Sequence, residues 1–248
     1  MKFLFIVQGE GRGHFTQAIT LEEMLLRNGH EVVEVLVGKS STRTLPGFFN
    51  RSIHAPVKRF ISPNFLPTAD NKRANLTKSF AYNLLKLPEY IRSMYYINQR
   101  IRETGAEVVI NFYELLTGLT YALFRPSVPY ICVGHQYLFL HHDFEFPDKS
   151  SCQLWMLRFF TRMTALKSSK KLALSFREME QDDNNQIVTV PPLIRQEVTA
   201  IRPEEGNYIH GYMVNSGFAD SVEHFHARHP EVPLTFFWDK SDTEEVIR

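Results

Sequence analysis

Short apolar runs alternate along the chain with longer segments in which apolar residues recur every three or four positions. The first run covers residues 3–7, and the segment after it, residues 15–28, repeats apolar side chains at Ala18, Leu21 and Leu25. The run is typical of a buried strand, and the spacing is typical of a helix. Alternation of this kind predicts an α/β fold whose parallel sheet is covered by helices on both faces.

The same pattern continues over most of the chain. Further strands are predicted at residues 31–37, 56–62, 106–112, 129–134, 170–176 and 186–192. Further helices are predicted at residues 76–86, 89–104, 114–124 and 151–167, and loops at 63–74 and from 135 to about 149.

The alternation breaks between residues 190 and 207, where prolines and charged residues indicate a linker. One strand, one helix and one strand then follow, and the sequence ends at Arg248. A single β-α-β unit cannot bury both faces of its own sheet, so it either docks on the first domain or is the front of a longer protein. We therefore expect a first domain over residues 1–195, a linker over 196–207, and the incomplete start of a second domain over 208–248.

Composition and charge narrow the class of protein. The 248 residues are 44% hydrophobic and 22% charged, which is ordinary for a soluble globular protein. Residues 1–175 carry 22 Lys and Arg against 13 Asp and Glu, whereas residues 176–248 carry 6 against 14. The split indicates two units with different partners, unless balanced charge simply falls unevenly. Because no nucleic-acid-reading motif accompanies the basic residues, no nucleic acid partner is expected.

The sequence points to the cytoplasm. The apolar run at residues 3–7 is shorter than the roughly 7–15 residues of a secretory signal, and no run approaches the roughly 18 residues of a membrane span. Cys132 and Cys152 are too few for a disulfide framework, so a reducing compartment is expected. A peripheral membrane contact is one interpretation of residues 151–167, where aromatic and basic residues alternate; a core helix with a solvated basic face is the other.

A glycine loop, "VQGEGRGHFTQA", joins the first strand to the first helix. Gly9 and Gly11 match the start of the dinucleotide fingerprint G-x-G-x-x-G, but His14 takes the place of the third glycine. The second strand ends in "VGKSS", without the carboxylate that would bind a ribose, and no G-K-[ST] follows the loop. A nicotinamide cofactor and a Walker-type phosphate site are both disfavoured.

His14 stands where open α/β sheets bind ligands, at the carboxyl edge of the first strand. A helix N-terminus disfavours the protonated ring, so His14 is expected to be neutral and able to act as a base; it could instead be an N-cap or loop residue. Glu114, after the fourth strand, could orient His14, or could be a first-turn carboxylate favoured by the helix dipole. Asn111 and Tyr113 flank it at the same edge.

Several histidines could suggest a metal site. His135 and Gln136 follow another strand end and belong to the ligand edge, and His141 and His142 come shortly after them. No cysteine and no tight carboxylate pattern accompanies these histidines, so no metal is predicted. The three histidines of residues 224–229 are expected to be solvated.

The stretch "FLFIVQGEGRGHFTQAITLEEMLLRNGHEV" resembles the opening of GT-B glycosyltransferases. The similar branches are the enzyme that adds N-acetylglucosamine to the lipid intermediate of peptidoglycan and the UDP-glycosyltransferases. "VVINFYELLTGL", "VPYICVGHQYLF" and "VTVPPLIR" fit the same N-terminal domain. The resemblance covers about residues 1–195, and residues 208–238 match the start of the second domain.

This resemblance implies a Rossmann-like doubly wound parallel sheet that binds the acceptor, and a second Rossmann-like domain that binds a nucleotide-sugar. The implied reaction transfers a sugar to an acceptor hydroxyl, on a glycan or glycolipid, with the nucleotide-sugar as co-substrate and without a metal or other cofactor. In the UDP-glycosyltransferase branch the histidine of this loop is the general base, a role that would go to His14, whereas in the lipid-linked branch the loop helps to bind the acceptor or the sugar diphosphate. Glu114, from its place at the sheet edge, is the candidate partner of His14. The residues expected to bind substrate are Gly11, Arg12, Gly13, Asn111, Tyr113, His135 and Gln136.

The family's donor motifs lie further along the second domain than Arg248, so the sequence predicts a truncated or partial glycosyltransferase. Three interpretations stay open: an enzyme, an acceptor-binding module whose donor domain is missing or on a separate chain, and a non-catalytic α/β domain.

Overall fold

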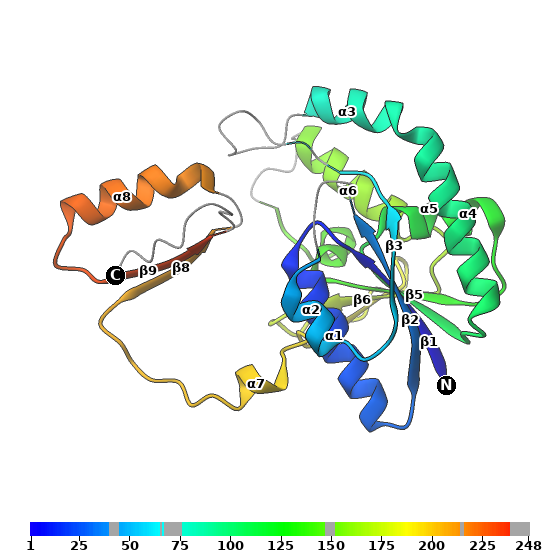
Figure 1. The fold of residues 1–248 in the computed structure, drawn as a ribbon, viewed down its shortest axis with the longest axis horizontal. Coiled ribbons are helices and arrows are strands. Elements are labelled where there is room, and N and C mark those ends of the chain that lie inside the picture. The colour runs from blue at the N-terminus through cyan, green and yellow to red at the C-terminus, as the bar shows by residue number, and fades with distance from the viewer. Residues whose placement is uncertain (40–44, 65, 67–75, 147–151, 214–215, 239–248) are drawn as a thin grey trace. The chain divides into compact units, whose positions relative to one another are not determined.

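A computed structural model of the chain describes residues 1–39, 45–64, 66, 76–146, 152–213 and 216–238 (Figure 1). Its contacts divide the chain into two compact units. Met1–Asn64 and Lys86–Ala200 make the first, and Phe65–Leu85 and Ile201–Arg248 make the second. The division at Ala200 falls inside the predicted linker. The grouping of residues 65–85 with the later part of the chain has no counterpart in the sequence pattern.

The first unit is built on a seven-stranded sheet with the order β3-β2-β1-β4-β5-β6-β7. All six strand pairings are parallel. The strands are β1 (Lys2–Gln8), β2 (Glu31–Lys39), β3 (Val57–Ile61), β4 (Val108–Phe112), β5 (Tyr130–Val133), β6 (Lys170–Leu174) and β7 (Ile187–Val190). The predicted Rossmann-like, doubly wound α/β fold is confirmed. The strand order reverses between β1 and β4, and such a switch point opens a crevice at the carboxyl edge.

Helices cover both faces of this sheet. They are α1 (Arg12–Arg27), α2 (Gly47–Ser52), α4 (Leu87–Glu103), α5 (Leu115–Phe124), α6 (Cys152–Thr164) and the 3-10 helix η1 (His135–Leu140). The unit also contains α7 (Gln196–Thr199), a four-residue helix with no buried residue. Figure 1 shows α1 and α2 on one side of the sheet and α4 and α5 on the other. Successive residues of β1 enter two different cores, Phe5 beside Phe15 and Phe49, and Leu4 beside Ile97. A strand buried on both faces reads as a continuous apolar run, which is why the sequence located β1 well.

Helix α1 begins earlier than its apolar spacing suggests. Gly11 is the N-cap, with extended backbone and no side-chain cap, so His14 lies inside the first turn. The alternative that His14 is itself an N-cap or loop residue is therefore wrong. The helix ends as expected, because Gly29 adopts a φ of 73° and His30 donates its backbone N–H to the carbonyl of Leu25.

The short helices α2, η1 and α7 were not predicted. α2 lies between β2 and β3, η1 occupies the first part of the loop expected after residue 134, and α7 lies in the predicted linker. α2 and η1 have six residues each and α7 has four, too few for a helical repeat of apolar positions to show in the sequence. Most of the predicted loop at 63–74 lies outside the described residues.

The second unit contains the expected β-α-β arrangement. β8 (Ile209–Met213) and β9 (Leu234–Trp238) pair in parallel, and a short 3-10 helix, η2 (Ser216–Phe218), and α8 (Ala219–Arg228) connect them. The unit also contains α3 (Leu76–Leu85). Within the part of the chain that the structure describes, no helix is both long enough and apolar enough to cross a membrane.

Gly118 of α5 provides a test of how tightly α5 and α6 pack. A Cβ at Gly118 would overlap the carbonyl oxygen of Met163 and lie 2.9 Å from the carbonyl carbon of Thr164. Both obstacles are backbone atoms, so Gly118→Ala should lower the free energy of unfolding by about 1–3 kcal/mol despite the better helix propensity of alanine. Chemical denaturation measures the change.

Gly13, also helical, has no heavy atom within 4 Å of its would-be Cβ and supplies the matched control. Gly13→Ala should leave stability unchanged or raise it slightly. Equal effects of the two substitutions would show that α5 and α6 do not pack as closely as described.

Candidate functional site

The carboxyl ends of β1, β4 and β5 meet at one edge of the sheet and bring four predicted residues together. His14 comes from the first turn of α1, Tyr113 and Glu114 from the turn between β4 and α5, and Gln136 from η1. Because parallel strands all end at the same edge, residues more than a hundred positions apart become neighbours.

His14 is held between two glutamines and a tyrosine. Its Nδ1 lies 3.3 Å from Oε1 of Gln17, and its Nε2 lies 3.3 Å from Nε2 of Gln136. The imidazole stacks on Tyr113 with ring centroids 5.9 Å apart and an interplanar angle of 18°. Only 7% of His14 is exposed, so these contacts fix the ring.

The His14 ring is neutral at physiological pH. Burial lowers the pKa of His14 from 6.5 to about 4, against a smaller upward effect of the Gln17 hydrogen bond and with a further lowering by the charge of His135. The sequence predicts a neutral His14 because of the helix N-terminus. In the structure, the largest cause of the lowered pKa is the loss of solvent around the ring.

Glu114 is the N-cap of α5. Its carboxylate accepts hydrogen bonds from the backbone N–H of Leu116 at 3.1 Å and from Oγ of Ser62 at 2.6 Å. Among the described contacts none joins Glu114 to His14. Of its two predicted roles, the hydrogen bonds match that of a helix-terminal carboxylate. Burial raises the pKa of Glu114 from 4.5 to about 7, although both hydrogen bonds act in the opposite direction.

Asn111 and Tyr113, predicted to bind substrate, both make hydrogen bonds within the protein. The Asn111 amide is fully buried, donates to the carbonyls of Glu114 (3.1 Å) and Thr164 (2.9 Å), and accepts from the N–H of Glu114 (2.9 Å). The Asn111 side chain therefore joins the turn after β4 to the end of α6 by hydrogen bonds. Tyr113 has a left-handed backbone with φ of 61°, and its hydroxyl lies 2.8 Å from Oγ1 of Thr161. Strain of this kind costs of order 1–3 kcal/mol and gathers at functional sites.

The loop glycines divide into two kinds. A Cβ at Gly9 would lie 2.6 Å from the carbonyl oxygen of Gly38, and one at Gly38 would overlap the Glu114 carboxylate. By contrast, Gly11 and Gly13 have open space where a Cβ would stand, and Arg12 is exposed between them. Gly9 lets the loop after β1 lie against Gly38 of β2, and Gly38 leaves room for the Glu114 carboxylate, whereas Gly11 and Gly13 leave the N-terminus of α1 open.

A cavity of about 870 Å³ opens at the same edge, after β5 and β6. Its lining includes Leu138, His142, Phe144, Arg177 and Met179. The segment after β6 was not recognised in the sequence, because it carries no glycine motif and reads as an ordinary polar loop. His135 is exposed at the start of η1, outside this lining.

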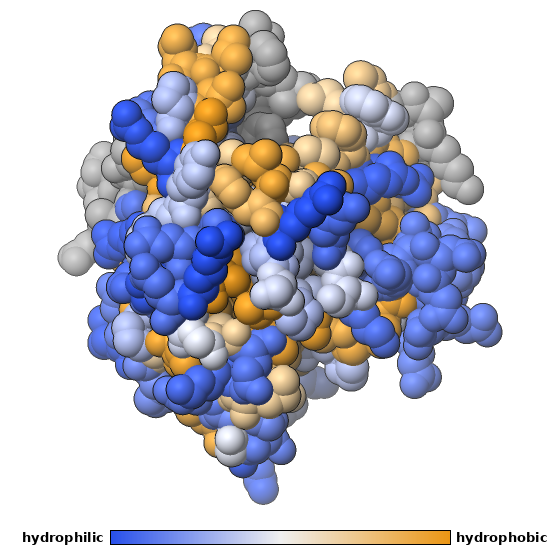
Figure 2. Space-filling model, turned by 90° about the vertical axis from the view of Figure 1, so that its right-hand side faces the viewer, coloured by the Kyte–Doolittle hydropathy of each residue, from blue (hydrophilic) through white to orange (hydrophobic). Residues whose placement is uncertain are grey.

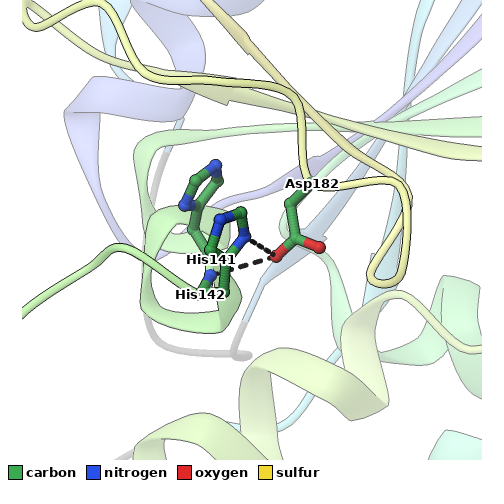
Figure 3. Close-up of side chains that lie close together, drawn as sticks. All are labelled: His141, His142 and Asp182. Atoms are coloured by element: carbon green, nitrogen blue, oxygen red, sulfur yellow. Dashed lines mark hydrogen bonds and ion pairs between the residues drawn. The ribbon is translucent and has the colours of Figure 1, made fainter.

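His141, His142 and Asp182 lie within 4.8 Å of one another and could hold a metal ion (Figure 3). Both His141 nitrogens are already engaged, however: Nδ1 accepts from the N–H of Asp143 at 3.1 Å and Nε2 lies 2.8 Å from the carbonyl of Glu180. Burial alone would raise the pKa of Asp182, but hydrogen bonds from Asn185 and His142 hold it well below its usual range. The cluster joins η1 to the loop after β6 by hydrogen bonds that a metal would have to break.

The comparisons with known proteins agree with this fold. A family model described as glycosyl transferase family 1 matches residues 1–237. A search of curated protein sequences found no significant match.

Solved structures share the fold at low identity. UGT89C1 of Arabidopsis thaliana complexed with UDP-L-rhamnose matches with a TM-score of 0.54 and 15% identity, over 96% of this chain and 63% of that one. The complex of the same protein with quercetin matches with a TM-score of 0.58 and 15% identity, over 100% of this chain and 67% of that one. UGT2 of Phytolacca americana, complexed with UDP-2fluoro-glucose and pterostilbene, matches with a TM-score of 0.54 and 13% identity, over 97% of this chain and 72% of that one. The chain thus spans less than two thirds of the first of these structures.

The raised pKa of Glu114 makes a prediction about stability. The unfolded chain ionises this group near pH 4.5 and the folded chain only near pH 7, so Glu114 lowers the free energy of unfolding as pH rises through that window. Glu114→Gln removes this loss. The stability of the variant relative to wild type should rise by about 3 kcal/mol between pH 4 and pH 8.

Urea denaturation at several pH values measures this difference. Glu197→Gln, an exposed change on α7, is the control and should run parallel to wild type. A Glu114→Gln curve that also stays parallel to wild type would mean that Glu114 ionises normally in the folded protein.

Proposed function

This chain belongs to glycosyl transferase family 1, and we propose that its first unit holds the acceptor of a sugar transfer with His14 as general base. The observation that carries the proposal is the buried, neutral imidazole, stacked on a strained Tyr113 at the strand-order switch point. Open α/β sheets bind ligands there, and strain and perturbed pKa values gather at functional sites.

In the proposed reaction, Nε2 of His14 takes the proton of an acceptor hydroxyl. The hydroxyl oxygen forms a bond to the anomeric carbon of a nucleotide-sugar, and the bond from that carbon to the diphosphate breaks, leaving its electron pair on the departing nucleotide. The protein's own part is to orient the hydroxyl and to receive its proton. We assign no metal and no other cofactor to this step.

The donor is proposed to be a nucleotide-sugar held by a second Rossmann-like domain, whose first β-α-β unit is β8, α8 and β9. The UDP-sugars in the complexes of UGT89C1 and UGT2 support this donor class. The acceptor is proposed to use the cavity after β5 and β6, whose mixed apolar and polar lining suits a glycan or glycolipid. In this scheme Glu114 shapes the edge, and Gly11, Gly13 and Arg12 face the substrate.

The alternative is an acceptor-binding module that works with a separate donor-domain chain. Calorimetry of this chain with UDP- and GDP-sugars tests the module: donor binding by this chain would contradict it, and acceptor binding without donor binding would contradict a self-sufficient enzyme.

His14→Ala should lower turnover of the complete enzyme by about 10²- to 10⁴-fold, because the variant loses the nitrogen proposed to receive the acceptor proton. Initial rates of sugar transfer give the comparison. His30→Ala, at the turn between α1 and β2, is the control and should retain turnover. Turnover of His14→Ala within twofold of wild type would leave His14 only a structural residue.

We also propose a peripheral membrane contact through α6. Trp155 and Phe159 are 63% and 49% exposed and stack at 5.4 Å on the helix surface, and Arg158 and Arg162 lie on the same helix. Helix α6 contains no acidic residue. Aromatic side chains in solvent beside cationic ones favour an anionic lipid surface over the core-helix interpretation. Figure 2, which faces the side carrying α4 and α5, shows that apolar side chains are also exposed between charged ones on that side of the molecule.

The membrane proposal predicts that the full chain cosediments with vesicles of phosphatidylglycerol and not with phosphatidylcholine alone. Trp155→Ala combined with Phe159→Ala should weaken this binding by about tenfold or more, through lost apolar burial. Leu123→Ala, an exposed apolar change on α5, is the control. Equal sedimentation of the double variant and wild type would rule out α6 as the contact.

A further inference from the structure

The two glutamines around His14 define which ring nitrogen carries the proton. A neutral imidazole has one N–H donor and one acceptor nitrogen. Oε1 of Gln17 can only accept, so Nδ1 must donate to it, and Nε2 of Gln136 can only donate, so Nε2 of His14 must accept from it. We infer that Gln17 and Gln136 are positioning residues that hold His14 as the Nδ1–H tautomer with its lone pair on Nε2.

Reversing the Gln136 amide alone is inconsistent with the contact that Gln17 makes to Nδ1. It would place a carbonyl oxygen against Nε2, and with Gln17 already accepting from Nδ1 the ring would need two N–H groups. That ring is the charged imidazolium, which burial disfavours. Among the described residues, the titratable groups recorded near the ring do not stabilise its charged form: Tyr113 stacks on the ring, and the charge of His135 acts against a second positive charge.

Gln17 replaces the carboxylate that commonly orients a catalytic histidine. It lies one helical turn after His14 on α1 and is 9% exposed, so the helix itself sets the separation of the two side chains. A neutral partner fixes the tautomer without adding stability to the imidazolium. His14 is therefore oriented by an amide rather than by the predicted Glu114.

Gln136 occupies the position that an acceptor hydroxyl would need. Its amide N–H binds the lone pair on Nε2, and its Oε1 is buried without a hydrogen-bond partner among the described residues. An incoming hydroxyl donates to Nε2 in place of the amide, whose N–H can then donate to the hydroxyl oxygen. This step rests on the proposed function; the tautomer does not.

Long-range ¹H–¹⁵N correlation spectra of the full chain at pH 7 test the tautomer directly. His14→Asn identifies the His14 signals by their loss. Wild type should show a protonated Nδ1 and an unprotonated Nε2. Gln17→Leu should convert His14 to the other tautomer or to a mixture, whereas Gln99→Leu, at an exposed position of α4, should change nothing. A wild-type Nε2–H ring would overturn the inference.

Gln17→Glu keeps the acceptor oxygen and adds charge, so it guards against a misfolded leucine variant. It should keep the Nδ1–H tautomer of the neutral ring and raise the pKa of His14 by one unit or more. An unchanged tautomer in Gln17→Leu together with an unchanged pKa of His14 in Gln17→Glu would show that Gln17 does not hold Nδ1, and would overturn the inference.

Turnover separates this inference from the proposed function. If the inference and the base role both hold, Gln17→Leu should lower kcat/KM by about two- to tenfold, the effect of one hydrogen bond. An Nδ1–H ring in wild type together with full activity of His14→Ala would remove the base role and leave the tautomer assignment standing.

Discussion

The site depends on the hydrogen bonds that Asn111 and Glu114 make where β4 ends. The Asn111 amide bonds both backbone groups of Glu114 and the carbonyl of Thr164 at the end of α6. Glu114 in turn caps α5 and accepts from Ser62 beyond β3. Four elements are thereby tied to one turn, and Tyr113 within it is held with a φ of 61°. That backbone, with the hydroxyl bonded at Thr161, sets the tyrosine ring against His14.

Burial shifts the pKa values of His14 and Glu114 in opposite directions, and both shifts favour the uncharged form. It lowers the pKa of His14 to about 4 and raises that of Glu114 to about 7, so each is pushed toward its uncharged form. The opposite signs mean that acid destabilises the fold through His14 and base destabilises it through Glu114. Because both groups are buried and uncharged, a charged ligand close to them would shift their pKa values strongly.

The fold could be predicted from the sequence because its signals are local. Strands such as β1 and β4 are buried on both faces and read as apolar runs, and α1 ends at a glycine that needs a left-handed backbone. The position of His14 at the carboxyl edge followed from the same pattern.

The contacts of His14 could not be predicted, because they depend on how side chains from distant elements meet. Gln136 stands 122 positions from His14, and Gln17 looks like any polar residue on a surface helix. Asn111 and Glu114 are polar residues at a strand end whether they bind a ligand or the backbone, and only the tertiary structure distinguishes the two. The cavity beyond β6 is similarly invisible, since its lining comes from two separate loops.

A histidine with a pKa near 4 is a poor base, and this limits how the site can work. The ring has the lone pair in the right tautomer, but taking a proton in a buried, uncharged site is costly. An amide partner such as Gln17 does not reduce that cost, whereas a carboxylate would. Negative charge must therefore come from elsewhere, and in the proposed reaction it grows on the departing diphosphate as the proton reaches Nε2. In the proposed reaction, proton transfer to His14 is then favourable only while the donor is bound and the bond from its sugar to the diphosphate is breaking. His14 therefore stays uncharged when no donor is bound.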